Sequence, residues 1–481
     1  MTEMPTTTMS APVTESAEAA ALDATATAMP QTATSQTNMR MGKVVDSVPD
    51  ASAAVRTSAA TTIPVTADAS SSHTATRIGA TAPSPARPSP APAHGAPNAR
   101  HGARGRRDRN SSVELLRILA MLMIVTSHGV MFSALDVTAQ PFGVNKVLVE
   151  TFLYSGGKVG VVAFFAISSW YLSEAGGVRV GLRRVWLLER EMLFWSLTLL
   201  AASVAAHALG HGPAAPDVAL IARSALPTVT ALWWYPTAYA VFLLFFPFLT
   251  RGLRALDRTT HRALCVVMIT LWTVLDMVMP LSGVGLPGGN WLSFVYIHTL
   301  ITYYRWHMTA NRPVRARTAW LALVAGYLMI AAGTVVGGLL FARTGRLETL
   351  QVYLGKVEFR LPVLLIGLAL FALFERGMFH SAAVNVLAGS TFGVYLISEY
   401  PTVRAWLWHD GPLAGVLEPA LLRSPWAVPV IVGVACAVFA ACAALDQLRA
   451  LLFRVTVDRR RGRWFDLLSG AFLRAVAKKA R

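Results

Sequence analysis

From residue 111 to residue 446 the chain consists of long apolar runs, separated by shorter segments that carry most of the charge. A helix of about 17 to 25 predominantly apolar residues crosses the hydrocarbon core of a bilayer. We predict ten such spans, at residues 113–134, 152–173, 191–209, 229–249, 263–281, 291–308, 319–341, 360–375, 384–403 and 426–446. The sequence therefore predicts an all-α, polytopic membrane protein with about ten transmembrane helices.

Composition agrees with a membrane domain, because 54% of the 481 residues are hydrophobic and only 14% are charged. The formal net charge of +17 suggests nucleic acid at first sight, but the basic residues form short clusters between the apolar runs. These clusters lie in alternate connecting segments, at residues 100–109, 179–190, 251–262, 305–317 and 459–463. The positive-inside rule describes this asymmetry. We predict a multi-pass protein of the cell membrane with both termini in the cytoplasm, and no nucleic-acid partner.

The chain before the first span is dominated by Ala, Thr, Ser and Pro. Such a segment buries too little apolar surface to offset its chain entropy, so we predict a disordered cytoplasmic tail at residues 1–110. It has no signal-peptide pattern, and a later start at Met39 or Met41 stays open. A transmembrane domain at residues 111–455 and a basic cytoplasmic tail at 456–481 complete the predicted organisation.

The first apolar run contains two ionisable residues, Arg117 and His128, eleven positions apart. Eleven residues of α-helix advance about 16.5 Å and complete three turns plus roughly 20°, so both side chains lie on one face. An ionisable group inside a bilayer costs about 2.5 to 3.5 kcal/mol even on lenient insertion scales, which favours a functional role. The alternative is that Arg117 snorkels to the headgroups and His128 bonds a neighbouring helix.

Ser111 and Glu114 form an S-x-x-E pattern at the start of this run. The pattern predicts a capping box, in which the two side chains satisfy free amides at the helix start. Glu114 is also three residues before Arg117, so an ion pair along one helix face is the other interpretation.

Aromatic and small residues mark the second and fourth spans. The segment GGKVGVVAFFAISSWYLS contains Ser168 and Tyr171 and is typical of helix packing through small residues with an aromatic belt. In LWWYPTAYAVFLLFFPFL, we interpret Trp233, Trp234 and Tyr235 as belt anchors at the outer interface, with Pro236 as a possible backbone opening.

Further intramembrane ionisable residues are Glu399, Asp276 and His298. Glu399 can orient an imidazole at similar depth or pair with Arg404. The sequence shows no partner for Asp276 or His298, so we interpret them as structural or pore-lining.

The sequence contains no GxSxG elbow, phosphate-binding loop, HExxH or dinucleotide fingerprint on a plausible strand. Its cysteines, Cys265, Cys436 and Cys442, lie in apolar runs without a CxxC pattern or a histidine at ligand spacing, so we predict no disulfide and no metal site. Any chemistry must be embedded in the membrane.

Four segments together resemble the acyltransferase type 3 family of integral-membrane acyltransferases. The first is the Arg-x10-His pattern of Arg117 and His128, and the second is FFAISSWY, which resembles the family's FFxISGY with Ser169 at the glycine and Trp170 inserted. The third is the LWWYP segment. The fourth is TFGVYLISEYP, where Ser398 stands at a position that is frequently His in the family. The resemblance covers about residues 110 to 450.

This resemblance implies that an acyl group, usually acetyl, passes from cytoplasmic acyl-coenzyme A to a hydroxyl of a surface glycan. Arg117 would bind a coenzyme A phosphate, and the distance to His128 is comparable with the reach of the pantetheine arm. His128, with Glu399, would deprotonate the acceptor or carry the acyl group. The residues expected to support the substrate or the site are Glu114, Ser168, Tyr171, Trp233 and Tyr395. The expected partners are membrane lipid, acyl-CoA and a glycan, with no metal.

Two other classes of protein stay open at this point. A secondary transporter or flippase for a polyprenyl-linked sugar would use the buried Arg, His and Glu to bind substrate or relay protons, but such proteins commonly show two halves with matching broken helices, and we find no such repeat. A non-catalytic membrane scaffold would leave the register of Arg117 and His128 unexplained.

Overall fold

The computed structural model describes residues 110–210, 215–278, 286, 288–309, 313–460, 465 and 470. The predicted tail at 1–110 therefore lies outside the described residues except for Asn110, and the tail at 456–481 is described only in part. Within these ranges the secondary structure is helical and includes no strand, which confirms the all-α class.

Seven helical segments of the described chain are long and apolar enough to cross a membrane. They are α1 (Ser111–Phe132), the continuous segment α2–η2–α3 (Val144–Leu172), α4 (Val178–Ala208), α6 (Trp234–Ala255), α7–η3–α8 (Arg258–Val278), α10 (Ala316–Thr344) and α15 (Ala427–Val455). The multi-pass membrane class is thus confirmed.

Shorter helices occupy the other three predicted spans. They are α9 (Trp291–Tyr303) with the π-helical turn η4 (Tyr304–Met308), α11 (Leu361–Glu375), and the series α12 (Ala382–Ala388), α13 (Thr391–Ser398) and α14 (Pro401–Ala405). A further short helix, α5 (Val218–Ala225), precedes α6. The number of ten spans stays a prediction, because none of these three segments is among the seven that are both long and apolar enough to cross a membrane.

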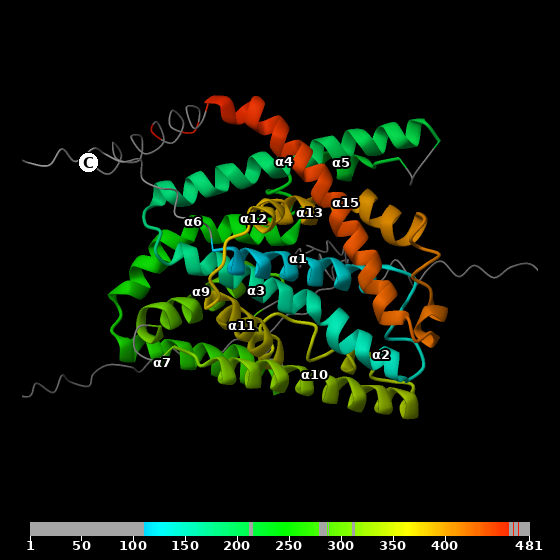
Figure 1. Cartoon of the computed structure of the whole chain (residues 1–481), viewed down its shortest axis with the longest axis horizontal. Helices are drawn as coiled ribbons and strands as arrows, with labels where there is room; N and C mark the ends of the chain where they lie inside the picture. The colour runs from blue at the N-terminus through cyan, green and yellow to red at the C-terminus, as the bar shows by residue number, and fades with distance from the viewer. Residues whose placement is uncertain are drawn as a thin grey trace, which may run out of the picture. The chain divides into compact units, whose positions relative to one another are not determined.

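Helix α1 lies in the middle of the helical layers (Figure 1) and contacts α3, α11, α12, α13 and α15. Small residues let α3 approach it closely. A Cβ at Gly160 would lie 2.5 Å from the Ala120 carbonyl oxygen, and one at Gly157 would lie 2.5 Å from Ser127 Oγ. This confirms the prediction of packing through small residues, and it sets the register of α3 against α1.

The start of α1 is joined to a segment far along the chain. Asn110 Nδ2 donates to the Gly377 carbonyl at 2.8 Å, and Ser112 Oγ donates to the Phe374 carbonyl at 2.7 Å. Ser111 Oγ bonds Asn385 Oδ1 at 3.0 Å. The N-cap is Asn110, whose side chain accepts from the Ser112 amide, so the predicted capping box of Ser111 and Glu114 is wrong. Ser111 already lies inside the helix, because the residue before it satisfies the free amide.

The predicted ninth span is broken into three short helices. Glu399 is the C-cap of α13, and Tyr400 has an extended backbone with φ −67° and ψ 131°. The residue before a proline is disfavoured in the helical region, so Pro401 ends one helix at this point and begins α14. Non-helical backbone at membrane depth requires burial within protein, and Tyr400 is 0% exposed. The break places the Glu399 side chain inside the helical domain.

Helix α6 begins with aromatic residues that pack inside the domain. Trp233 is 2% exposed and Tyr235 is 7% exposed, so the interpretation of these two as belt anchors is wrong. Their rings meet Tyr400 and Phe294 rather than lipid, because the segment before α6 turns inward. Pro236 falls in the first turn, where a missing amide costs no helical hydrogen bond.

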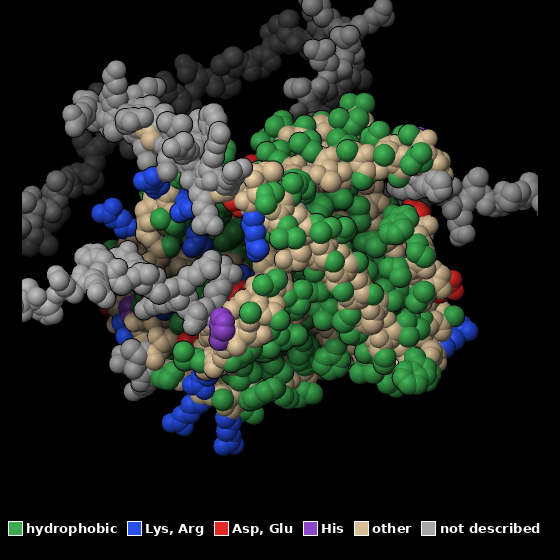
Figure 2. Space-filling view, turned by 45° about the horizontal axis from the view of Figure 1, so that its top comes forward, with side chains coloured by type: hydrophobic (Ala, Val, Ile, Leu, Met, Phe, Trp, Pro, Cys, Tyr) green, Lys and Arg blue, Asp and Glu red, His purple; other side chains and the backbone are tan. Residues whose placement is uncertain are grey.

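Figure 2 shows Lys and Arg side chains gathered at one end of the molecule, beside a mainly hydrophobic flank. The starts of α1 and α4 and the end of α6 lie together at one end of the domain (Figure 1). We call it the basic end; its residues include Arg179, Arg183 and Arg184 at the start of α4, Arg251 and Arg254 at the end of α6, and Arg315 and Arg317 before and at the start of α10. The arrangement matches the predicted charge asymmetry. Its assignment to the cytoplasm stays a prediction.

Candidate active site

The break after α13 brings a carboxylate to the imidazole of α1. His128 Nδ1 lies 2.8 Å from Glu399 Oε1, and the two side chains are 17% and 8% exposed. The other carboxylate oxygen lies 3.7 Å from Arg404, whose guanidinium sits 4.3 Å from the centre of the Phe132 ring. Glu399 therefore both contacts an imidazole and pairs with Arg404, as the two sequence-based interpretations proposed. His128 Nδ1 and Glu399 Oε1 are close but do not have the alignment of a hydrogen bond. A carboxylate this near to Nδ1 favours the tautomer with its proton there, which leaves Nε2 to accept a proton.

Arg117 lies nearer the basic end on the same helix. Its guanidinium pairs with Glu114 at 3.1 Å and lies 5.9 Å from the centre of the Phe164 ring. The ion pair confirms the prediction that Glu114 acts as an i, i+3 partner. The Arg117 side chain is 23% exposed, so part of its donor set remains open to a ligand.

A row of aromatic rings connects Arg117 with His128. From Phe164 on α3 the ring centres step 5.9 Å to Tyr235 on α6 and then 6.2 Å to Tyr395 on α13. Tyr395 lies 6.3 Å from the His128 ring. We call Phe164, Tyr235 and Tyr395 the ring row. Sequence reasoning missed the role of Tyr235, because nothing in the local pattern distinguishes a buried ring from an interfacial one.

The remaining predicted site residues are spread over the domain. Ser168 Oγ donates to the Phe164 carbonyl at 3.4 Å, and Tyr171 is exposed near the end of α3. Trp233 is buried, and its indole N–H has no hydrogen-bond partner in the part of the chain that the structure describes. The same holds for the hydroxyl of Ser398, which is 1% exposed.

The sequence analysis also missed an ion pair at the depth of His128. Lys158 follows Gly157, which packs on Ser127 of α1. The Nζ atom of Lys158 lies 3.2 Å from Glu358 Oε2. Glu358 is 0% exposed and accepts from the Gly289 amide at 2.6 Å. Burial acts to raise the pKa of Glu358, but the Lys158 ammonium and the Gly289 amide outweigh it and hold that pKa below its usual value.

Asp276 and His298 have partners, contrary to the sequence-based expectation. Asp276 Oδ2 lies 3.1 Å from Arg360 Nη1. His298 is 0% exposed and bonds Ser169 through Nδ1 at 2.8 Å and Thr250 through Nε2 at 3.0 Å. Since both of its nitrogens are bonded, His298 joins α3, α6 and α9 as a structural residue, consistent with one of the two predicted roles. These partners lie far away in the sequence, where spacing gives no signal.

The family model for the acyltransferase domain matches residues 110–445. The chain belongs to the acyltransferase type 3 family. It is therefore a membrane acyltransferase, and the matched region contains the His128–Glu399 pair, Arg117 and the whole ring row. No curated protein and no solved structure matches the chain.

Proposed function

We propose that this acyltransferase moves an acyl group, with acetyl as the expected one, from cytoplasmic acyl-CoA to a hydroxyl of a cell-surface polysaccharide or lipid-linked glycan. The observation that carries the proposal is the His128 imidazole, 2.8 Å from the Glu399 carboxylate, at one end of the ring row, with Arg117 at the other end. His128 as a base and Arg117 as an anion-binding group lie on the same helix. This arrangement suits acyl-CoA, a long thioester that carries phosphates at its nucleotide end.

Arg117 binds a phosphate of coenzyme A in this proposal. A guanidinium donates two parallel hydrogen bonds to a phosphate, and its pairing with Glu114 fixes its orientation without using every donor. The basic end keeps the nucleotide hydrated and attracts its negative charge. The pantetheine arm then follows the ring row over the rise of about 16.5 Å to His128.

His128 acts as the general base. Its Nε2 takes the proton of the acceptor hydroxyl, and the acceptor oxygen forms a bond to the thioester carbonyl carbon. The carbon–sulfur bond breaks, and the coenzyme A thiolate leaves with the proton from His128. Glu399 stabilises the imidazolium that exists between the two proton transfers. An acyl-histidine intermediate on Nε2 is the alternative route, and burial protects the thioester from water in both cases.

Release of free thiol from acetyl-CoA tests this proposal, with the purified protein in lipid and extracted surface glycan as acceptor. We expect glycan-dependent release that is lost in His128→Ala and that requires more acetyl-CoA in Arg117→Ala. The matched control is His207→Ala, because His207 is exposed at the end of α4. If no glycan supports release and the protein instead moves a lipid-linked sugar across the membrane, a transporter replaces this proposal.

A further inference from the structure

Five tyrosines are buried in the described part of the protein, and besides Tyr395 of the ring row they fall into two groups. Tyr296 bonds Thr273 at 2.8 Å, and Tyr400 bonds Ser224 at 2.8 Å. Tyr235 has no hydrogen-bond partner among the described residues, and the Tyr304 hydroxyl, which lies near the Val314 backbone, has none of good geometry there. Since buried hydroxyls in proteins are nearly always bonded, each of these two requires an explanation.

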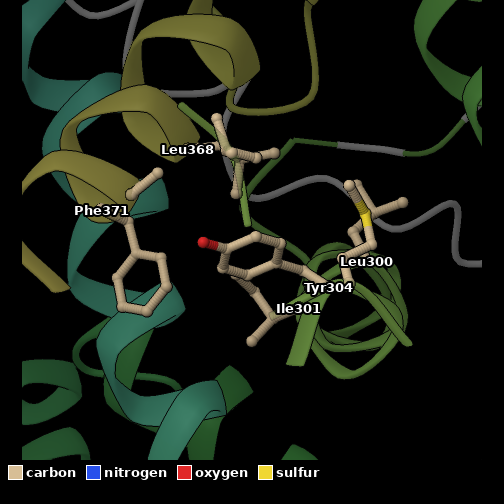
Figure 3. A pocket seen from close by; sticks show the side chains of 8 residues that line it. Leu300, Ile301, Tyr304, Leu368 and Phe371 are labelled. Atoms are coloured by element: carbon tan, nitrogen blue, oxygen red, sulfur yellow. The ribbon is translucent and has the colours of Figure 1, made fainter. Parts of the chain in front are cut away.

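Tyr304 lies beside an apolar cavity of about 160 Å³ between α9, η4 and α11. Figure 3 shows its hydroxyl pointing into the space near Phe371, with Leu300, Ile301 and Leu368 around it. The other lining side chains are all apolar, so the cavity offers no second polar group to define a ligand. The lining of this cavity therefore does not indicate a class of ligand.

Tyr235 is placed differently, because it lies in the middle of the ring row. Its ring meets Phe164 edge-on at 5.9 Å and Tyr395 at 6.2 Å, and it is 7% exposed. Phe164 lies next to the Arg117 guanidinium and Tyr395 lies next to the His128 ring. Tyr235 therefore lies between Arg117 and His128 along the ring row.

The proposed reaction needs a hydrogen-bond donor that the His128–Glu399 pair does not supply. The thioester carbonyl oxygen gains negative charge as the acceptor oxygen adds to the carbon, and a preorganised donor at that oxygen is commonly the largest catalytic contribution. Glu399 only accepts hydrogen bonds when ionised, and His128 Nε2 is engaged with the acceptor proton. Arg117 lies about 16.5 Å away along the helix axis.

The start of α6 adds to the case for Tyr235 as this donor. Helix α6 begins inside the domain without a side-chain cap, so the first amides of the helix present their positive end toward the ring row. Trp233, the N-cap, is a second buried donor without a partner among the described residues, but its ring lies 6.1 Å from Tyr400 and outside the ring row. The route from Arg117 to His128 passes two tyrosines, Tyr235 and Tyr395. Of these, Tyr235 is the one whose hydroxyl has no partner among the described residues.

We propose that the hydroxyl of Tyr235 donates a hydrogen bond to the carbonyl oxygen of the acyl thioester and stabilises the oxyanion. This inference rests on the proposed function. The acceptor hydroxyl loses its proton to His128 Nε2 and bonds to the carbonyl carbon, and the carbonyl electron pair moves onto the oxygen held by Tyr235. When that pair returns, the carbon–sulfur bond breaks, and the thiolate takes the proton from His128.

The substitution Tyr235→Phe in the full chain tests the proposal, because it keeps the packed ring and removes the donor. With acetyl-CoA and extracted surface glycan, we expect kcat to fall by about 10²- to 10³-fold, as when one oxyanion donor is lost elsewhere. The KM for acetyl-CoA should stay nearly unchanged. Tyr296→Phe is the control, because that hydroxyl is bonded within the protein, to Thr273.

A spectroscopic measurement separates a catalytic role from a structural one. The infrared carbonyl band of acetyl-CoA labelled with carbon-13 at the carbonyl is recorded on the His128→Ala protein, with Tyr or Phe at position 235. We expect a lower carbonyl frequency with Tyr235. If the frequencies agree and Tyr235→Phe retains the kcat of Tyr296→Phe, the inference is overturned and the acyltransferase proposal stands. If the wild-type protein releases no thiol, the Tyr235 inference and the proposed function are both contradicted.

Discussion

Replacing Gly393 on α13 by Ala should strongly destabilise the folded protein. A Cβ at this position would overlap the Asp446 carboxylate of α15, closer than any real Cβ contact. Asp446 is 0% exposed and accepts from Trp195 Nε1 at 3.1 Å and from Arg449 Nε at 2.7 Å. The carboxylate must therefore retreat and lose these bonds.

The cost of Gly393→Ala follows from two effects. Overpacking a well-packed interior costs about 1 to 3 kcal/mol, and separating a buried ion pair costs about 3 to 5 kcal/mol. Since the retreat of Asp446 relieves part of the overlap, we expect about 3 to 5 kcal/mol in total. Activity should fall as well, because α13 carries Tyr395 and ends at Glu399.

Unfolding of the purified protein in mixed micelles with increasing denaturing detergent measures this cost. Gly433→Ala is the control, because a Cβ at this position on α15 meets nothing within 4 Å. That substitution should instead stabilise the helix by about 0.5 to 1 kcal/mol. If the two alanine variants unfold alike, Asp446 does not require a glycine at position 393 and the packing argument is wrong.

Three further predictions concern the charged groups. Glu399→Gln keeps the shape of the side chain but removes the carboxylate beside His128 Nδ1. The kcat for thiol release should therefore fall by up to about 10⁴-fold. An unchanged kcat would show that Glu399 is not part of the active site. Arg117→Lys keeps the charge but not the planar fork, and we expect a raised KM for acetyl-CoA with little change in kcat; a kcat effect alone would contradict phosphate binding. The pKa of Glu358 is lowered by Lys158, so its stabilising contribution is complete above the unfolded pKa and is lost as the pH falls toward the folded value. Stability measured against pH should therefore show a shallower acid limb in Glu358→Gln, and identical limbs would contradict the ion pair.

Local patterns in the sequence predicted much of this architecture. The apolar runs coincide with helices because the bilayer length sets their size, and the Glu114–Arg117 pair follows from helical spacing alone. The placement of Arg117 and His128 on one helix also needed only the helical period. These features depend on neighbours within a few turns.

The features that were predicted wrongly depend on contacts between distant segments. Trp233 and Tyr235 have an interfacial composition, but the chain before α6 turns inward and buries them. The break that positions Glu399 has a local signal in Pro401, which a continuous span at 384–403 ignored. The partner of Asp276, Arg360, comes from a connecting segment that no spacing rule joins to it.

The hydrogen bonds that join Ser111 and Ser112 to the segment at residues 374–385, here called the latch, affect the order in which this protein is built. Ser112 bonds a carbonyl 262 residues later, and Ser111 bonds Asn385, 274 residues later. Ribosomal synthesis is vectorial, so the first helix enters the bilayer with its arginine and histidine long before Glu399 and the latch exist. The first helix must therefore remain in the membrane without these contacts until the last third of the domain has been synthesised. A chain truncated before residue 374 should leave this helix without its anchor.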